Sequence, residues 1–207
     1  LFALTSTANA QILINEVDSD SPGTNAAEFV ELYAGLPASI SLDGLVLVFF
    51  NGSSDTSYLA VDLDGQTTGA DGFFVFAGAA ANVPHTDLEV GPGTTNLIQN
   101  GADAVALYRG DAADFPNGTP PTIVNLMDAL VYDTDDGDDA GLLILLNAGQ
   151  EQINEDEKNM KDDQSNQRCP NGAGGVRNTA NYDQFTPTPG ELNLCVTPVV
   201  CGDGMIG

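Results

Sequence analysis

The chain has few basic residues, with only five Lys and Arg among its 207 residues. Contact with a phosphate backbone needs clustered Lys and Arg, so we expect no nucleic acid among the partners. Long apolar runs are also missing, and no stretch approaches the roughly 18 apolar residues of a membrane-spanning helix. We therefore expect neither nucleic-acid binding nor insertion into a membrane.

Tryptophan is absent, and His85 is the one histidine of the chain. His85 lies in a Pro/Thr/Asp segment with no nucleophile beside it, which is typical of an exposed loop residue. The three cysteines lack Cys-x-x-Cys spacing, and the sequence contains no nucleotide-binding or nucleophile-elbow motif. The sequence predicts no catalytic residue, and we expect the protein not to be an enzyme.

Acidic residues are abundant: 30 Asp and Glu give a formal net charge of −25. A high net charge often accompanies disorder. Here, however, 42% of the residues are hydrophobic, and they occur in short alternating runs. The 23 Gly and 11 Pro residues lie largely between these runs, a pattern typical of short strands joined by turns. We predict a folded, acidic, all-β protein.

Apolar alternation predicts a series of strands over the first two thirds of the chain. Asn100-Gly101 favours a type I′ hairpin between residues 96–99 and 104–108, because both residues tolerate positive φ. Further on, residues 142–146 are expected as strand or helix and 147–163 as surface loop or short helix. The remainder is expected as loop with one edge strand. The predicted strands are 11–17, 28–33, 45–50, 58–63, 73–77, 96–99, 104–108 and 124–132.

All three cysteines lie near the end of the chain. In an exported protein, Cys169 and Cys195 are the natural disulfide pair, and the loop that they close is long enough to stabilise the fold by a few kcal/mol. Cys201 is then left over. It begins Cys-Gly-Asp-Gly, which resembles the start of the Cys-rich repeats of large exported bacterial proteins, so we expect its partner beyond residue 207.

Two groups of carboxylates are candidates for metal binding. The first comprises Asp18, Asp20 and Glu28. The spacing of Asp18, Asp20 and Gly23 partly matches the start of a calcium loop, in which alternate oxygen ligands converge. It is not an EF-hand, because Pro22 takes the third ligand position and Glu28 comes one residue early.

The second group is a dense acidic run. Holding so many like charges together is costly without a cation, and Ca²⁺ prefers oxygen ligands. We therefore expect Ca²⁺ as a cofactor, with a solvated acidic loop as the alternative for either group. Residues 154–157, which Lys158 and Lys161 follow, are expected to form surface ion pairs instead. The second group consists of Asp133, Asp135, Asp136, Asp138 and Asp139.

Several segments resemble the lamin tail domain family. Residues 28–33 (EFVELY) are similar to its second strand, and residues 41–47 (SLDGLVL) to its Leu-x-Gly-Trp-x-Leu strand, with Leu45 where Trp is usual. Residues 72–78, 84–88 and 100–108 (NGADAVALY) follow in the order of the family. The resemblance implies an immunoglobulin-like β-sandwich and a non-catalytic module that mediates attachment or assembly.

The remainder resembles an extension found in secreted bacterial members, carried by residues 127–133, 165–172 and 186–193. This implies a lamin-tail-like sandwich over 11–110 and a loop-rich C-terminal extension over 111–193 that packs on it. Residues 1–10 (LFALTSTANA) are either the remnant of a signal peptide or an N-terminal strand. Residues 194–207 are expected as a linker and the start of a Cys-rich repeat. Nuclear members have been associated with DNA, but this chain lacks the basic patch that such contact needs.

Three functions remain open from the sequence. The first is a secreted or cell-surface adhesive or scaffolding module, stabilised by Ca²⁺, whose partners are other extracellular proteins or copies of itself. The second is a subunit of an extracellular filament or matrix, in which the N-terminal segment adds as a strand to a neighbouring copy. The third is an accessory domain of a secreted nuclease or phosphoesterase. In each case we expect further domains of a longer parent chain.

Overall fold

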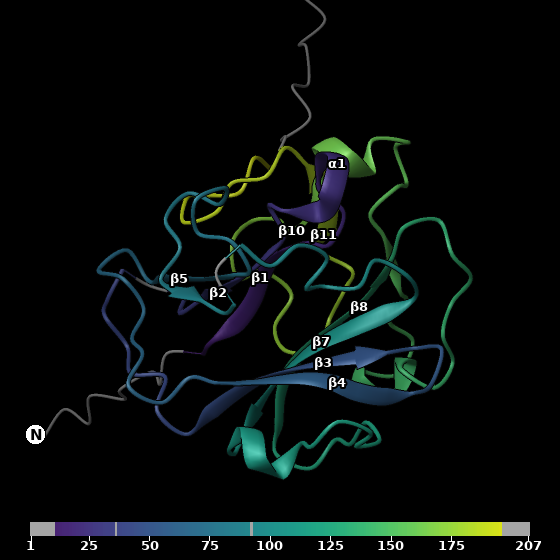
Figure 1. Cartoon of the computed structure of the whole chain (residues 1–207), viewed down its shortest axis with the longest axis horizontal. Helices are drawn as coiled ribbons and strands as arrows, with labels where there is room; N and C mark the ends of the chain where they lie inside the picture. The colour runs from purple at the N-terminus through teal and green to yellow at the C-terminus, as the bar shows by residue number, and fades with distance from the viewer. Residues whose placement is uncertain (1–10, 36, 92, 196–207) are drawn as a thin grey trace, which may run out of the picture.

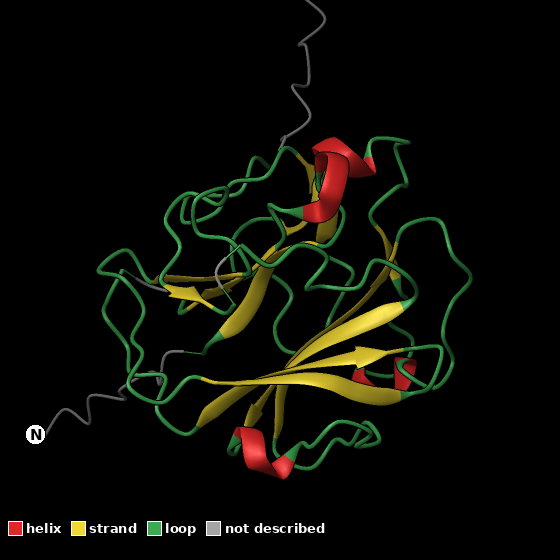
Figure 2. Cartoon of the chain, in the orientation of Figure 1, coloured by secondary structure: helices red, strands yellow, loops and turns green. Residues whose placement is uncertain are grey.

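The computed structural model describes residues 11–195 except 36 and 92, and regular structure in this part of the chain is almost all β (Figure 1). Two sheets pack face to face, which confirms the expected all-β sandwich. Helices are confined to single turns in the connecting loops (Figure 2). They are α1 (Pro22–Asn25) and three 3₁₀ turns, η1 (Ala112–Asp114), η2 (Leu143–Leu145) and η3 (Lys161–Asp163).

Both sheets are mixed. The six-stranded sheet has the order β11-β10-β1-β2-β5-β6, and the five-stranded sheet has the order β4-β3-β7-β8-β9. Neighbours are antiparallel except for the pairs β5–β6 and β8–β9, which are parallel. The strands of the first sheet are β1 (Leu13–Asp18), β2 (Phe29–Tyr33), β5 (Phe73–Ala77), β6 (Leu88–Glu89), β10 (Ser165–Arg168) and β11 (Tyr182–Phe185). Those of the second are β3 (Leu45–Asn51), β4 (Thr56–Asp62), β7 (Asp103–Arg109), β8 (Leu126–Asp133) and β9 (Ile153–Asn154).

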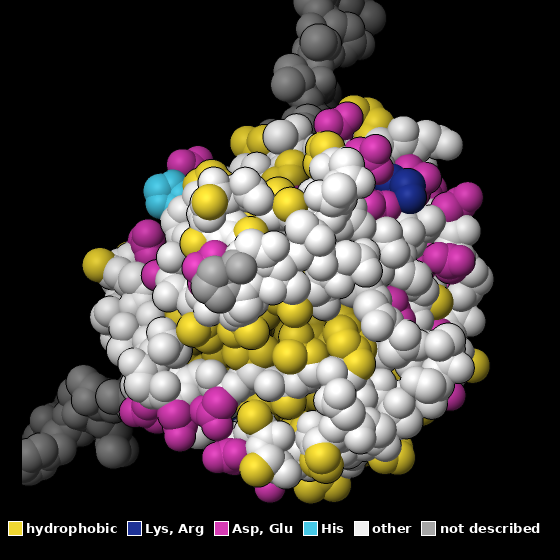
Figure 3. Space-filling model, viewed as in Figure 1, with side chains coloured by type: hydrophobic (Ala, Val, Ile, Leu, Met, Phe, Trp, Pro, Cys, Tyr) yellow, Lys and Arg dark blue, Asp and Glu magenta, His cyan; other side chains and the backbone are white. Residues whose placement is uncertain are grey.

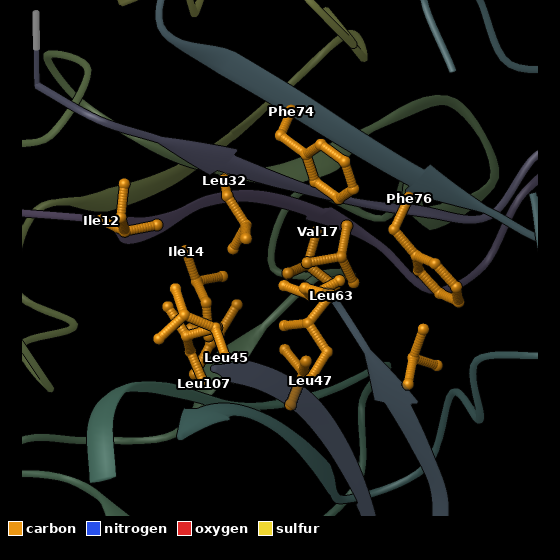
Figure 4. Packing of buried hydrophobic residues seen from close by; sticks show 14 of the residues in the cluster. Ile12, Ile14, Val17, Leu32, Leu45, Leu47, Leu63, Phe74, Phe76 and Leu107 are labelled. Carbon is orange, nitrogen blue, oxygen red and sulfur yellow. The ribbon is translucent and has the colours of Figure 1, made fainter. Parts of the chain in front are cut away.

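The main hydrophobic core fills the space between the sheets (Figure 4). Leu32 of β2 and Phe74 of β5 lie on one side of it, and Leu45 and Leu47 of β3 and Leu107 of β7 lie on the other. Alternate residues of a strand point to the same face, so each strand contributes every second side chain to this layer. Burial of these side chains is the main source of stability for the sandwich.

The second sheet is covered on its outer face as well. Val46, Val48 and Phe50 of β3 pack there in a second cluster with Leu142 and Leu145, from the segment around η2. A strand that is buried on both faces reads as a continuous apolar run rather than an alternating one. This double burial explains why β3 begins LVLVFF.

Residues 96–99 do not form the predicted strand. The backbone N–H groups of Leu97 and Ile98 donate to the carboxylate of Glu28, so a side chain takes the donors that a neighbouring strand would need. The predicted hairpin at Asn100-Gly101 is wrong for the same reason. β7 pairs instead with β3 and β8.

Residues 111–193 supply strands to both sheets, with β8 and β9 in the second and β10 and β11 in the first. Residues 142–146 contain the 3₁₀ turn η2, and 147–163 contain β9 and η3. The single edge strand expected in the loop-rich stretch from residue 169 to 193 is present as β11, at the edge of the first sheet. Strand β10, which pairs with β11, was not predicted. β10 has the sequence SNQR and is buried throughout, so it carries no apolar alternation that a sequence pattern could detect.

The predicted disulfide is confirmed: Cys169 is bonded to Cys195, with their Cα atoms 5.4 Å apart. It ties the residue after β10 to the end of the described chain. Cys201, the signal remnant or strand expected at 1–10 and most of the linker expected at 194–207 lie outside the described residues. Within the described part, no helix has the length and apolar character needed to cross a membrane.

Candidate functional site

The structure brings Asp18, Asp20 and Glu28 together and adds Glu155, and we call these four residues the acidic cluster. Asp18 ends β1 and Glu28 directly precedes β2, and the two strands meet there because Asp18 pairs with Phe29. Glu155, which follows β9, comes from the other sheet. Its carboxylate accepts the backbone N–H of Ser19 at 3.2 Å and that of Asp20 at 3.4 Å. Carboxylates of both sheets therefore share one buried region.

The burial of Glu155 corrects the expected surface role of residues 154–157. Glu155 is fully buried, whereas Lys158 pairs with Asp183 at 2.7 Å and Lys161 pairs with Asp20 at 2.7 Å. The sequence offers no signal for this, since Glu155 lies in the polar run NEDE. The parallel pairing of β9 with β8 carries it inward.

Three oxygens of the acidic cluster are buried and accept no hydrogen bond from any described residue: Oδ1 of Asp18, Oδ2 of Asp20 and Oε1 of Glu28. Oδ2 of Asp20 lies 2.7 Å from Nζ of Lys161 in an ion pair, which leaves Asp18 and Glu28, only 4% and 3% exposed, with an oxygen that has no partner in the described chain. The other oxygen of Glu28, Oε2, accepts the N–H groups of Leu97 at 2.6 Å and Ile98 at 3.2 Å. A buried acceptor without a donor loses the hydrogen bonds that water would give it.

Two neighbouring buried glutamates, Glu16 and Glu31, differ from Asp18 and Glu28 in that all their carboxylate oxygens accept hydrogen bonds. Both oxygens of Glu16 are occupied, by Ser165, Gln167 and Thr188. Both oxygens of Glu31 are occupied as well, by Asn15 and Gly190. The fold thus supplies donors to the glutamates beside the cluster and leaves Asp18 and Glu28 short of them.

Burial raises the pKa values of Asp18, Glu28 and Glu155, because it disfavours the charged form of a carboxyl group. The pKa of Asp18 lies well above its usual value, through burial first and then through the charges of Glu155, Glu16, Glu28 and Asp20. Burial raises the pKa of Glu28 to about 7 and that of Glu155 to about 8, against the lowering effect of their hydrogen bonds. A region that resists ionisation to this degree favours an added positive charge, whether a proton or a cation.

A pocket of about 300 Å³ reaches the cluster from the surface. Asp18 lines it together with Asp162 and Asp163, and Phe29 and Val83 contribute apolar walls. In the conformation described for residues 11–195, no three His, Cys, Asp or Glu side chains are arranged around one point to hold a metal ion. The chemistry of the donors is nevertheless that of a hard cation site, because every ligand atom on offer is an oxygen.

The structure does not bring the second predicted group, the acidic run from Asp133 to Asp139, together around one point. Asp133 is buried and both its oxygens are used: Oδ1 accepts the N–H groups of Asp135 and Asp136, and Oδ2 accepts the side chain of Gln152. Asp139 Oδ1 caps the turn at Gly141. Asp135, Asp136 and Asp138 are exposed.

Asp136 and Asp139 instead help to line a polar hollow of about 640 Å³, which we call the loop-end hollow. The ends of β3 and β8 and the start of β7 lie side by side there, because Asn51 pairs with Asp103 and Asp103 pairs with Tyr132. The loops that leave these strands surround the hollow. Its lining is formed by Asn51, Gly52, Ser53, Asn96, Gln99, Asn100, Gly101, Ala102, Asp103, Asp136, Gly137 and Asp139.

Close backbone packing shapes the hollow at Gly52. A Cβ at this position would lie 2.0 Å from the carbonyl oxygen of Ala102 and 2.6 Å from Oδ2 of Asp139, so only glycine fits. The N–H of Gly52 donates to Oδ1 of Asp103 at 2.9 Å. Burial raises the pKa of Asp103, and the charges of Asp136 and Asp139 raise it further.

Side chains from both sheets hold the loop at 96–100 that borders the hollow. The N–H of Gln99 donates to the hydroxyl of Tyr58 at 3.0 Å, and the hydroxyl of Tyr132 donates to the carbonyl of Gln99 at 2.9 Å. The preceding residue Ile98 is held by Glu28. The acidic cluster and the loop-end hollow are therefore connected through Glu28.

His85 lies apart from both sites. Its side chain is 59% exposed, and its nearest charged partner is Glu191, at 3.8 Å. On the face shown in Figure 3, acidic side chains are spread around the rim and basic side chains occupy only a small area.

Comparison of the chain with family models, with curated proteins and with solved structures finds no match.

Proposed function

We propose that this chain is a non-catalytic recognition module of an exported protein, which serves adhesion, scaffolding or assembly. The observation that carries the proposal is the loop-end hollow. Connecting loops at the end of a rigid sandwich are a common place for binding residues, because the strands fix their positions while their side chains vary. Here the pairing of β3, β7 and β8 fixes the ends from which the lining loops start.

The lining of the hollow favours a basic segment of another extracellular protein. Asp103, Asp136 and Asp139 supply carboxylates, and Asn51 and Gln99 supply carboxamides, while no Lys or Arg lines the hollow. Complementary charge steers association and favours the correct partner. The lining groups hold a ligand through hydrogen bonds and ion pairs, which suits a binding role; His85, the one histidine, is placed outside it.

We further propose that the sandwich is of the immunoglobulin-like type and related to lamin tail domains. The motif-bearing strands support this, because β2 and β5 are neighbours in one sheet and β3 and β7 are neighbours in the other. The disulfide between Cys169 and Cys195 supports export, since such bonds form and persist in oxidising compartments.

Titration of the full chain with a short peptide containing Lys and Arg tests the proposed function, read by NMR shifts of the backbone amides. We expect the shifts to concentrate at Gly52 and Ser53, at 99–103 and at 136–139. The double substitution Asp136→Asn/Asp139→Asn should weaken binding by about tenfold or more, as the loss of close charge pairs does. Asparagine keeps the Oδ1 acceptor that caps the turn at Gly141.

A matched control is Glu151→Gln/Glu157→Gln, which removes the same charge from exposed side chains outside the hollow. This variant should bind the peptide within about twofold of the unsubstituted chain, because the charges it removes lie outside the hollow and are screened by salt. Shifts spread evenly over the acidic surface, or equal weakening by both variants, would contradict the proposal.

A further inference from the structure

We propose that the acidic cluster is a buried site for one Ca²⁺ ion, bound through the free oxygens of Asp18 and Glu28. The inference is independent of what the loop-end hollow binds. It starts from two buried oxygens, Asp18 Oδ1 and Glu28 Oε1, that accept no hydrogen bond within the described chain; the third such oxygen of the cluster, Asp20 Oδ2, is paired with Lys161. Both side chains are more than nine-tenths buried.

The charge balance of the cluster points to a cation. Asp18, Asp20, Glu28 and Glu155 gather there, and Lys161 is the one basic side chain that pairs with any of them in the described structure. Lys161 contacts Asp20 on the side of the cluster that faces solvent, with 37% of its side chain exposed. The charges of the other carboxylates act on Asp18, and like charges held this close are costly unless a cation neutralises them.

The donors select the kind of ion. All four side chains offer carboxylate oxygens, and the cluster has no histidine nitrogen or cysteine sulfur. Ca²⁺ binds six to eight oxygens in variable geometry and accepts water among its ligands, whereas Mg²⁺ demands a near-ideal octahedron. An irregular set of carboxylates drawn from two sheets fits Ca²⁺ better.

The ion has a route into the cluster. The pocket of about 300 Å³ opens onto Asp18, and Asp162 and Asp163 at its wall attract cations toward it. The free oxygens do not converge in the conformation described, so binding turns the side chains of Asp18 and Glu28 toward a common point. In the described conformation the N–H groups of Leu97 and Ile98 hold Oε2 of Glu28, so Oε1 is the oxygen that is free to bind the ion.

Binding at this site fastens the end of β1 to the start of β2 and to the loop at 97–98. Thermal unfolding of the full chain in EDTA and in Ca²⁺ measures the effect. A ligand that binds only the folded state raises Tm by mass action, and at about a hundred times Kd we expect a rise of about 5–10 °C. Mg²⁺ at the same concentration should raise Tm less.

Asp18→Asn and Glu28→Gln are the informative variants, because each keeps the shape of the side chain and removes its charge. Each should fold and lose most of the Ca²⁺-dependent rise in Tm. Glu151→Gln/Glu157→Gln, with exposed side chains, should keep the full rise. Amide exchange supplies a second measurement: Ca²⁺ should slow exchange at Leu97 and Ile98 in the unsubstituted chain and leave it unchanged in Asp18→Asn.

Two outcomes would overturn the inference. The first is the absence of any rise in Tm with millimolar Ca²⁺, which means that protons alone neutralise the cluster. The second is a rise that Asp18→Asn and Glu28→Gln retain in full, which places the ion elsewhere on the acidic surface. Neither outcome bears on the peptide titration, so the proposed function and this inference can fail separately.

Discussion

Asp128 and Asp18 are both buried strand carboxylates of this sandwich, but the structure surrounds them with different partners. Asp128 of β8 is fully buried, and its Oδ2 accepts Nη2 of Arg168 at 3.0 Å. Oδ2 also accepts the N–H of Ile14, and Oδ1 accepts the N–H of Arg177. Asp18 of β1 is almost as deeply buried, and its Oδ1 has no donor among the described residues.

The comparison distinguishes a buried carboxylate that holds the fold together, Asp128, from one with an oxygen free to bind a ligand, Asp18. Arg168 lies on β10 of the first sheet and Asp128 on β8 of the second, so their ion pair joins the two layers. Arg168 also donates to the carbonyl groups of Ile14 and Ala173. Both oxygens of Asp128 therefore have hydrogen-bond donors within the described chain. The acidic cluster keeps free acceptor oxygens next to a pocket that reaches the surface.

The largest expected effect on stability comes from breaking the ion pair between Arg168 and Asp128. Arg168→Met leaves the carboxylate of Asp128 buried without its cation, and we expect the free energy of unfolding to fall by about 3–5 kcal/mol. Urea unfolding in EDTA measures the change. The double variant Arg168→Met/Asp128→Leu should recover a large part of the loss, because no unpaired charge remains. A single variant within about 1 kcal/mol of the unsubstituted chain would show that the pair does not hold the sheets together.

The next largest expected effect is a dependence of the free energy of unfolding on pH, which arises in the acidic cluster. Burial raises the folded-state pKa of Glu28 from 4.5 to about 7 and that of Glu155 from 4.5 to about 8. The folded state therefore holds protons that the unfolded state has released. The stabilisation that these bound protons give the folded state is complete below the unfolded-state pKa, near 4.5. It is lost as the pH rises through the folded-state pKa values of Glu28 and Glu155.

In EDTA, the free energy of unfolding should fall by about 2 kcal/mol through Glu28 alone between about pH 5 and pH 8, after allowance for solvent screening. Glu28→Gln should lose that share of the slope, and urea unfolding at a series of pH values measures it. Equal slopes for the two proteins would show that Glu28 titrates in the folded state as it does in the unfolded chain. Burial also raises the pKa of Asp128, but Asp128 and Arg168 are the same in both proteins, so their contribution cancels in the comparison.

The smallest expected effect on stability comes from the partly exposed ion pair between Lys161 and Asp20 of the acidic cluster. Lys161→Met removes the ion pair with Asp20, in which 37% of the lysine side chain is exposed, so stability in EDTA should change by less than about 1 kcal/mol. If the cluster binds Ca²⁺, removal of the competing cation should raise the Ca²⁺ affinity, which calorimetric titration measures. Lys158→Met, which removes the pair with Asp183, is the control and should leave the affinity unchanged. Weaker Ca²⁺ binding in Lys161→Met would contradict this account of the cluster.

Much of the fold could be predicted from local patterns. Alternation of apolar and polar residues located β2, and short continuous apolar runs located β3, β5 and β7, because a strand buried on both faces reads as such a run. Strand β10 was not predicted. β10 is made of Ser, Asn, Gln and Arg, and these side chains are buried because distant residues such as Glu16 and Asp128 satisfy them.

The candidate sites show the same division. Asp18, Asp20 and Glu28 could be grouped from their spacing. Glu155 could not, because it reaches the cluster only through the pairing of β9 with β8. The sequence pattern placed a strand at 104–108, directly after Asp103, but the part of Asp103 in the loop-end hollow depends on its register with Asn51.

The sequence by itself determined the all-β class, the acidic surface and the pair of cysteines that form the disulfide. These follow from composition and short-range periodicity, which act on neighbouring residues. Only the tertiary structure decided which carboxylates are satisfied and which are left open. That outcome depends on donors more than a hundred residues away, such as Ser165 and Thr188 for Glu16, and no local pattern records whether such a donor arrives. Asp18 and Glu16 are two residues apart on the same strand, yet the packed fold gives one of them a full set of partners and leaves an oxygen of the other free.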